Sequence, residues 1–238
     1  MPPAAPTLAM PAPQNAPQNT PLTAPEQRTV AILASVRQAF ADKGFDGASM
    51  QDLARASGIS VGNFYRYFPS KSAIVEALIS SDLDEIEAMF RAILESPRPM
   101  QALRETLAWR IAQQQKTLEG QLWSEISAVA RRKPEIGAVM ARMETQVTDY
   151  LIRTFAAETR LPLAEVQARF APHAAFIILL IKSVSCFCGA AQNAAHRQDS
   201  QDDLNLLILR TIDNSLAEVS AAARPPQTCP TSSVLKAR

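Results

Sequence analysis

The chain contains 238 residues with a net charge of +1, and 47% of its residues are hydrophobic. This length is sufficient for one or two domains with a sizeable core. The near-neutral charge argues against a nucleoid-type protein, which would bind DNA without an effector through strong positive charge. Three cysteines do not make a disulfide framework, and their odd number is typical of a reducing cytoplasm.

The first 27 residues are predicted to form a disordered leader. Met1–Pro25 contains eight prolines and no charged residue, so it cannot bury a core. It also lacks the basic start and the apolar run of a secretory signal, which favours a cytoplasmic protein. Residues 224–238 are predicted to form a disordered tail.

An amphipathic helix is predicted over Arg28–Lys43, where apolar side chains recur at helical spacing along one side. Gly44 is expected to end this helix, because a residue without Cβ adopts positive φ freely. Phe45 can then fold back onto the last turn.

Two short helices with a tight turn between them are predicted over Ser49–Lys71. Ser49 and Asp52 have the spacing of a capping box at the start of the first helix. Gly58 supplies the left-handed residue of the turn, and Ser60 caps the second helix. Helix, short glycine turn and helix together make the helix-turn-helix pattern.

The second of these helices has a buried side and a polar side. Phe64 and Phe68 share one side and are expected in the core. The opposite side offers amide, guanidinium and hydroxyl groups beside a glycine, which suits duplex DNA, although a small helical hairpin with a solvated face is the alternative. The candidate DNA contacts on it are Ser60, Val61, Gly62, Asn63, Tyr65, Arg66 and Tyr67.

These candidates have different expected roles. Arg66 and Asn63 can bond base edges, Gly62 permits a close approach, and Val61 can touch a thymine methyl group, while the hydroxyl groups suit phosphates. Lys71 lies in the first turn of the next helix, where a cation opposes the helix dipole. It is therefore expected to do little for folding and to clamp a phosphate.

The rest of the chain is predicted to be helical throughout, because no strand alternation appears. The helix predicted over Ser70–Ser96 connects the helix-turn-helix to the rest of the chain. Pro172 is expected to divide one segment into a short helix and a longer one. The predicted helical segments are Ser70–Ser96, Pro99–Leu118, Glu119–Lys133, Pro134–Thr159, Leu163–Ala195 and Asp199–Ala223.

Two of these helices are unusually apolar. Phe176–Ile181 is an unbroken hydrophobic run, and Leu204–Val219 carries a stripe of leucine, isoleucine and valine. The stretches can form the core of the chain itself or a four-helix seam with a second copy. The seam is favoured because a single helix-turn-helix makes too few base contacts. A membrane span over Ala171–Ala195 is the rival, but Lys182 and other polar residues interrupt it, so no membrane partner is expected.

A ligand pocket is predicted in this helical part. The helix Pro99–Leu118 has its main apolar stripe on one face and an indole, a hydroxyl and an amide on another. An aromatic and Met-rich lining would prefer an apolar or planar ligand, although the same side chains can simply fill the core. With only two histidines and no ligand spacing, no metal and no cofactor is predicted. The candidate lining residues are Trp109, Gln113, Trp123, Ser127, Met140, Met143 and Phe176.

The segment GISVGNFYRYFPSK closely resembles the signature of the tetracycline-repressor (TetR) family of bacterial transcriptional regulators, and the resemblance covers Arg28 to about Leu78. It implies an all-α fold with a helix-turn-helix domain over residues 28–72 and a helical effector-binding and dimerisation domain over residues 73–223. Many members have a polar or basic residue where Val61 stands. The positions that the resemblance implies in DNA contact, mostly with its backbone, are Ser49, Ser60, Gly62, Asn63, Tyr65, Tyr67 and Lys71.

The sequence therefore predicts a cytoplasmic, homodimeric DNA-binding regulator, namely a ligand-released repressor of a palindromic operator. Its partners would be double-stranded DNA and an apolar or aromatic small molecule. The alternatives are an effector-independent DNA-binding protein and a helical enzyme with an interaction module. The enzyme has little support, because no nucleophile–histidine pairing, phosphate loop or metal-like carboxylate cluster appears.

Overall fold

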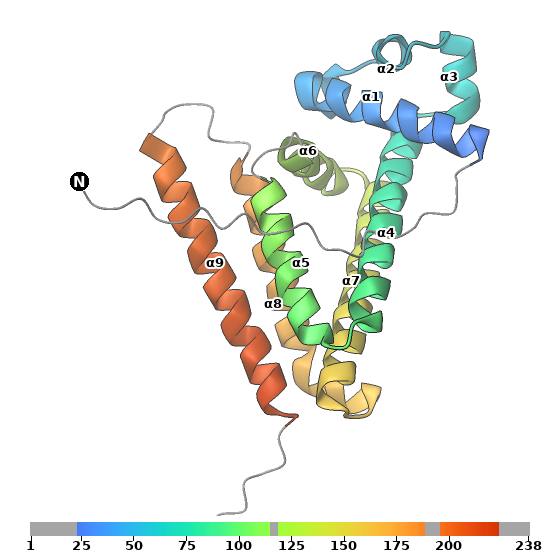
Figure 1. Cartoon of the computed structure of the whole chain (residues 1–238). Coiled ribbons are helices and arrows are strands. Elements are labelled where there is room, and N and C mark those ends of the chain that lie inside the picture. Colours follow the sequence, from blue (N-terminus) through green and yellow to red (C-terminus); the bar gives the residue numbers. More distant parts are fainter. Residues whose placement is uncertain (1–22, 115–118, 189–195, 224–238) are drawn as a thin grey trace, which may run out of the picture.

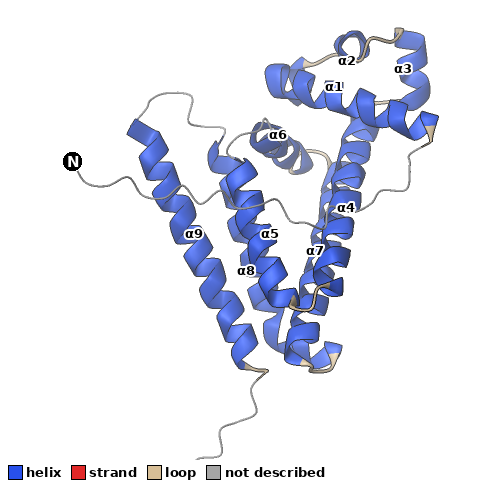
Figure 2. Cartoon of the chain, viewed as in Figure 1, coloured by secondary structure: helices blue, strands red, loops and turns tan. Residues whose placement is uncertain are grey.

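The computed structural model describes residues 23–114, 119–188 and 196–223. Every regular element in these ranges is an α-helix, which confirms the predicted all-α fold (Figure 2). The predicted tail, Cys229 and the first 22 residues of the predicted leader lie outside the described residues. In chain order the helices are α1 (Ala24–Gly47), α2 (Met50–Ala56), α3 (Val61–Tyr67), α4 (Lys71–Glu95), α5 (Pro99–Gln114), α6 (Glu119–Ala130), α7 (Pro134–Thr159), α8 (Leu163–Cys188) and α9 (His196–Ala221).

Helices α1, α2 and α3 form a small unit, here called the head, at one end of the molecule (Figure 1). Its core combines side chains from all three helices with the first turns of α4. Phe40, Leu53, Phe64 and Leu78 are almost completely buried there. Each of these residues lies on the apolar face of its own helix, so the amphipathic pattern of the sequence accounts for this core.

Helix α1 begins four residues earlier than the sequence analysis predicted. The Thr23 N–H donates to Glu26 Oε2 at 2.7 Å, and Pro25 occupies the first turn, where its missing N–H costs nothing. The predicted leader of 27 residues was therefore too long, because residues 24–27 are helical. The signal was present in the sequence as a threonine followed three residues later by a glutamate.

Gly44 interrupts α1 with φ 70° and ψ 166°, a conformation that its missing Cβ makes accessible. One more helical turn follows, to Gly47. The ring of Phe45 stacks on that of Phe40 with the centroids 5.6 Å apart. The fold-back of Phe45 is confirmed, while the predicted helix end at Gly44 is a break within a longer element.

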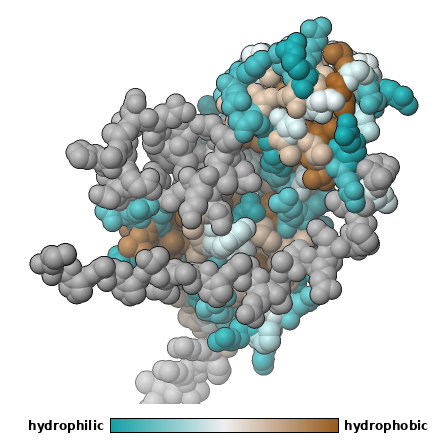
Figure 3. Space-filling view, turned by 45° about the horizontal axis from the view of Figure 1, so that its top comes forward, coloured by the Kyte–Doolittle hydropathy of each residue, from teal (hydrophilic) through white to brown (hydrophobic). Residues whose placement is uncertain are grey.

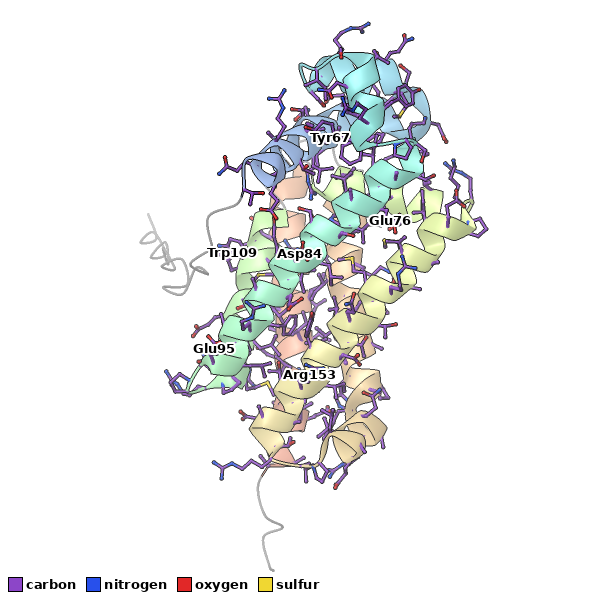
Figure 4. The ribbon with its side chains drawn as sticks, turned by 90° about the vertical axis from the view of Figure 1, so that its right-hand side faces the viewer. Tyr67, Glu76, Asp84, Glu95, Trp109 and Arg153 are labelled. Carbon is purple, nitrogen blue, oxygen red and sulfur yellow. The ribbon has the colours of Figure 1, made fainter. Side chains whose placement is uncertain are left out.

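Helix α4 runs from the head along the length of the remaining helices, and Glu76, Asp84 and Glu95 mark its course in Figure 4. We call α4 to α9 the body. Helix α7 packs against both α4 and α8, and α5 lies against α4, α7 and α8. Helix α9 stands on the outer side, next to α5 and α8, and α6 packs against α1, α7 and α8 at the end of the body nearest the head (Figure 1).

The buried apolar side chains form two clusters. One joins the head to α6 and the start of α7, with Ile126 and Ile136 among its members, and the other fills the body. Met143 packs against both. The domain boundary between residues 72 and 73 stays a prediction, but α6, which that boundary assigns to the second domain, shares the core of the head.

Helix α8 continues through Pro172, so the predicted division at this residue is wrong. A proline inside a helix costs about 3 kcal/mol. On both sides of it α8 buries large apolar side chains, including Val166, Phe170 and Ile177. Burial of such side chains is worth about 1.5–3 kcal/mol each, which outweighs the local cost.

By length and composition, Leu163–Val184 is the one segment among the described helices that could cross a membrane. Within the chain, 22% of the apolar window of this segment is buried. The helix packs against α5, α6, α7 and α9, so it belongs to the body of the molecule. Its remaining apolar surface is considered below.

Candidate nucleic-acid interface and internal cavity

Helix α2 is fixed at its start by the predicted capping box. The Ser49 hydroxyl accepts from the Asp52 N–H at 3.1 Å, and the Ser49 N–H donates to the Asp52 carboxylate at 3.0 Å. Lys43 Nζ donates to the same carboxylate at 2.8 Å. The hydrogen bond from Lys43, followed by those from Ser49, holds the pKa of Asp52 well below its usual range. The Asp52 carboxylate thereby ties α1 to α2.

The turn between α2 and α3 has the predicted geometry. Gly58 has φ 66°, which only a residue without Cβ adopts without strain. The Ile59 N–H donates to the Ala54 carbonyl at 3.2 Å, and this closes the turn. Ser60 then caps α3, its hydroxyl accepting from the Asn63 N–H at 3.3 Å. The helix-turn-helix predicted from the sequence is thus formed through local hydrogen bonds.

Helix α3 is held to the head from one side. Phe64 and Phe68 are buried, with ring centroids 5.7 Å apart. The other side is exposed, and we call it the recognition surface. In the space-filling view the head carries hydrophilic residues with hydrophobic ones interspersed (Figure 3), and Tyr67 lies at this end of the molecule (Figure 4). The recognition surface consists of Ser60, Val61, Gly62, Asn63, Tyr65, Arg66 and Tyr67, which are all exposed.

Two features of the recognition surface are not needed by the fold. A Cβ added at Gly62 would meet no atom within 4 Å, and the backbone there is ordinary helix. Among the described residues, no carboxylate pairs with Arg66. Glycine weakens a helix by about 0.5–1 kcal/mol relative to alanine, so internal packing gives no reason for glycine at position 62.

Lys71 has a structural role that the sequence analysis missed. Its side chain is half-buried, with Nζ donating to the carbonyls of Phe45 at 2.8 Å and Asp46 at 3.3 Å. The same ammonium lies 4.9 Å from the centroid of the Phe45 ring. The expectation that Lys71 does little for folding was therefore wrong, because it closes the end of α1 onto the start of α4.

The end of α1 is also bound to α6 and to the turn that follows α6. Glu125 Oε2 accepts from the Phe45 N–H at 3.2 Å, and Arg132 pairs with Asp46 at 2.8 Å. Lys133 Nζ lies 5.3 Å from the centroid of the Phe45 ring. The partners are 80 or more residues apart in the chain, so no local pattern in the sequence predicts them.

A cavity of about 150 Å³ lies in the body between α4, α5, α6, α7 and α8 and is open to solvent on one side. It is positioned where the two hydrophobic clusters meet, because Trp123 and Met140 belong with the first cluster and Phe90 and Leu107 with the second. Most of its wall is apolar. The lining residues are Ile86, Met89, Phe90, Ile93, Leu103, Thr106, Leu107, Arg110, Trp123, Ser127, Met140, Met143, Glu144, Val147, Leu151, Ile178, Ile181 and Lys182.

Four of the seven candidate lining residues reach this cavity, namely Trp123, Ser127, Met140 and Met143. Trp109 and Phe176 do not line it, and each is 40% exposed. Two residues along a helix correspond to about 200°, so Trp109 points away from the face of α5 that carries Leu107, and Phe176 away from the face of α8 that carries Ile178. The side chain of Gln113 lies outside the described part of the chain.

The charged residues of the wall were missed by the sequence analysis. Glu144 and Lys182 form an ion pair with each other. Arg110 follows Leu103 and Leu107 at helical spacing on the same face of α5. In the sequence, the position of Arg110 within the apolar stripe of α5 was the feature that could have indicated a charged group in the cavity wall. No group of three or more His, Cys, Asp or Glu side chains in the described ranges could hold a metal ion.

Comparisons with known proteins agree with this architecture. Residues 32–78 match the family described as bacterial regulatory proteins, tetR family. The transcriptional regulator UidR of Escherichia coli K12 is 28% identical over 120 residues, which is 50% of this chain and 60% of UidR. EthR of Mycolicibacterium smegmatis is 37% identical over 81 residues, which is 33% of this chain and 37% of EthR.

Among solved structures, Salmonella enterica GusR superposes with a TM-score of 0.62 at 24% identity, covering 82% of this chain and 98% of GusR. At that identity the likeness establishes the fold. The sequence match with UidR spans 60% of that relative's length.

Proposed function

Because this chain belongs to the tetR family of bacterial regulatory proteins, we propose that it is a transcriptional repressor that binds operator DNA through α3. The observation that carries the proposal is the recognition surface. There Gly62, which the internal packing does not require to be glycine, is surrounded by exposed amide, guanidinium and phenol groups. A helix of this kind fits the major groove of B-DNA. The relatives named above are regulators, and we assign no enzymatic activity.

Each group of the recognition surface has a distinct part in this proposal. Arg66 and Asn63 bond base edges, where an arginine prefers guanine and an amide prefers adenine. Tyr65 and Tyr67 bond phosphates through their hydroxyl groups and fix the register of the helix. Lys71 uses two of its three N–H donors on carbonyls, which leaves one for a phosphate at the edge of the site.

The protein acts as a homodimer in this proposal, with a seam built from α8 and α9. Apolar side chains on these helices are unusually exposed, with Leu179 at 62% and Leu207 at 59%, and Leu206 and Phe176 are exposed as well. Exposed apolar surface of this kind marks an interface. A two-fold dimer places two α3 helices on half-sites about one turn apart, which requires a palindromic operator.

A small molecule in the cavity releases the operator through α6. Trp123 and Ser127 face the cavity, while Glu125, on the same helix, holds the end of α1. A ligand that favours a shifted α6 would therefore move α1 and, with it, the start of α4 and the spacing of the two heads. Such coupling requires different ligand affinities for the two arrangements. This route places the effector in the cytoplasm, where operator DNA is found.

Selection of genomic fragments bound by the purified protein tests the repressor proposal directly. The expected result is an enriched palindrome, bound by two protomers, and an Arg66→Ala variant whose base preference is relaxed at one position of each half-site. Recovery of fragments without a shared motif would refute sequence-specific binding. Unchanged base preference in Arg66→Ala would reassign Arg66 to the phosphate backbone.

A further inference from the structure

We propose that the cavity binds a small apolar carboxylic acid and that Arg110 holds its carboxylate. The inference rests on the proposed function in one respect, because it takes this cavity to be the effector site.

The volume limits the ligand to a small molecule. An apolar protein cavity of about 150 Å³ takes up a guest the size of benzene, and the cavity of this protein has about 150 Å³. A single ring with a short substituent, or a short aliphatic chain, therefore matches it. A large polycyclic ligand would extend beyond this volume toward solvent.

The polar groups are gathered toward the head. Helix α5 runs from the far end of the body toward α6 (Figure 1). Leu103 and Arg110 both line the cavity from α5, and seven residues of helix separate them by about 10 Å. Arg110 is thus at the end nearer α6, which contributes Trp123 and Ser127, whereas the end at Leu103 is apolar. The ligand should accordingly have one apolar end and one polar end.

The charged residues of the wall indicate whether the polar group of the ligand is an anion or a cation. Glu144 and Lys182 neutralise each other in the wall. The hydrogen-bonding contact of Arg110 among the described residues is with Met89, its Nη1 lying 4.0 Å from Sδ, and no described carboxylate pairs with it. Because the Glu144–Lys182 pair is neutral as a whole, Arg110 leaves the wall of the cavity with one excess positive charge. Its planar fork matches a carboxylate through two parallel hydrogen bonds.

Ser127 and Thr106 complete the polar end. The Thr106 hydroxyl donates to the Ala102 carbonyl at 2.8 Å, so it adds polarity to this end but has no hydrogen left to donate to a carboxylate. Thr106 and Arg110 are four residues apart and lie on one face of α5. A neutral amide or alcohol could use such groups, but it would leave the guanidinium without an anion. An amine would be repelled.

Tryptophan fluorescence provides a direct test, because the chain has two tryptophans and Trp123 is the one that lines the cavity. In a Trp109→Phe background, 4-ethylbenzoate, phenylacetate and octanoate are titrated, each beside its neutral amide. We expect at least one acid to bind about ten times or more tighter than its amide. Arg110→Met should weaken that acid about 10- to 100-fold and leave the amide unchanged.

Arg91→Met serves as the matched control, because Arg91 pairs with Glu87 at 3.2 Å and does not line the cavity. It should leave acid binding unchanged. Arg110→Lys retains the charge without the fork and should fall between the wild-type protein and Arg110→Met, which guards against a folding defect in the latter. The proposal is overturned if no acid of the panel binds more tightly than its amide, or if Arg110→Met binds the acid as the wild-type protein does.

Operator binding, measured on the same samples, separates this inference from the proposed function. If an acid binds at Arg110 and DNA is bound but not released, the ligand class stands and the release mechanism fails. If DNA is bound and the acids show no preference over amides, the ligand class fails and the DNA-binding function stands.

Discussion

Replacing Gly62 by alanine adds one carbon atom, Cβ, which should have opposite effects on the stability of the protein and on its affinity for DNA. In a helix, alanine is more stable than glycine by about 0.5–1 kcal/mol. The added Cβ would meet no atom of the protein within 4 Å, so no steric cost offsets this gain. For a chain of this size, 1 kcal/mol corresponds to about 2–4 °C in Tm, and we expect the variant to melt about 1–4 °C higher.

The same methyl group should impair operator binding. If Gly62 permits the backbone of α3 to approach the groove, the added carbon has to displace a base edge or a sugar, at a cost typical of overpacking, about 1–3 kcal/mol for each half-site. Because a dimer meets this cost twice, the affinity should fall by about 30-fold or more. Fluorescence anisotropy with a labelled operator fragment and differential scanning calorimetry measure the two effects.

Gly58→Ala is the matched control for this experiment. Gly58 also has open space around a Cβ, but its φ is 66°, so alanine there introduces strain of about 1 kcal/mol or more. Its Tm should fall where that of Gly62→Ala rises. A Gly62→Ala protein that binds the operator with wild-type affinity would show that α3 does not approach DNA at this residue.

Three other perturbations test the head and its connection to the body. Lys71→Met should lower the Tm, because two carbonyls lose their donor, and should reduce the slope of log K against log salt by about one for each half-site; an unchanged slope would leave Lys71 with its structural role alone. Glu125→Leu removes the acceptor of the Phe45 N–H, so it should preserve ligand binding, followed by tryptophan fluorescence, and blunt DNA release in an anisotropy assay; full release would exclude α6 as the route. Asp52→Asn should destabilise the head at neutral pH, and because the pKa of Asp52 is lowered on folding, the Tm difference from the wild-type protein should shrink as the pH falls below about 4; a constant difference would mean that charge is not the cause.

The local features of the head could be predicted because their causes are local. The capping of α2 by Ser49 and Asp52, the left-handed residue Gly58 and the burial of Phe64 and Phe68 each depend on residues within a few positions of one another. Thr23 and Glu26 carry the same signal as Ser49 and Asp52, but they stand within the proline-rich stretch, whose composition predicts a disordered leader up to residue 27. The helix break predicted at Pro172 was wrong for another reason, because the packing of α8 outweighs the cost of the missing N–H of this proline.

By itself, the sequence determined the helices, the faces that they bury and the surface that α3 exposes, because hydrophobic periodicity and capping act over one or two turns. Only the tertiary structure decided which residues meet across helices. Lys71 closes on carbonyls 25 and 26 residues away, and Glu125 meets Phe45 across 80 residues. The cavity likewise takes Arg110 and Trp123 but leaves out Trp109, because the rotation of α5 against its neighbours selects one face of the helix. Such contacts depend on how whole helices pack, and no window of sequence contains that information.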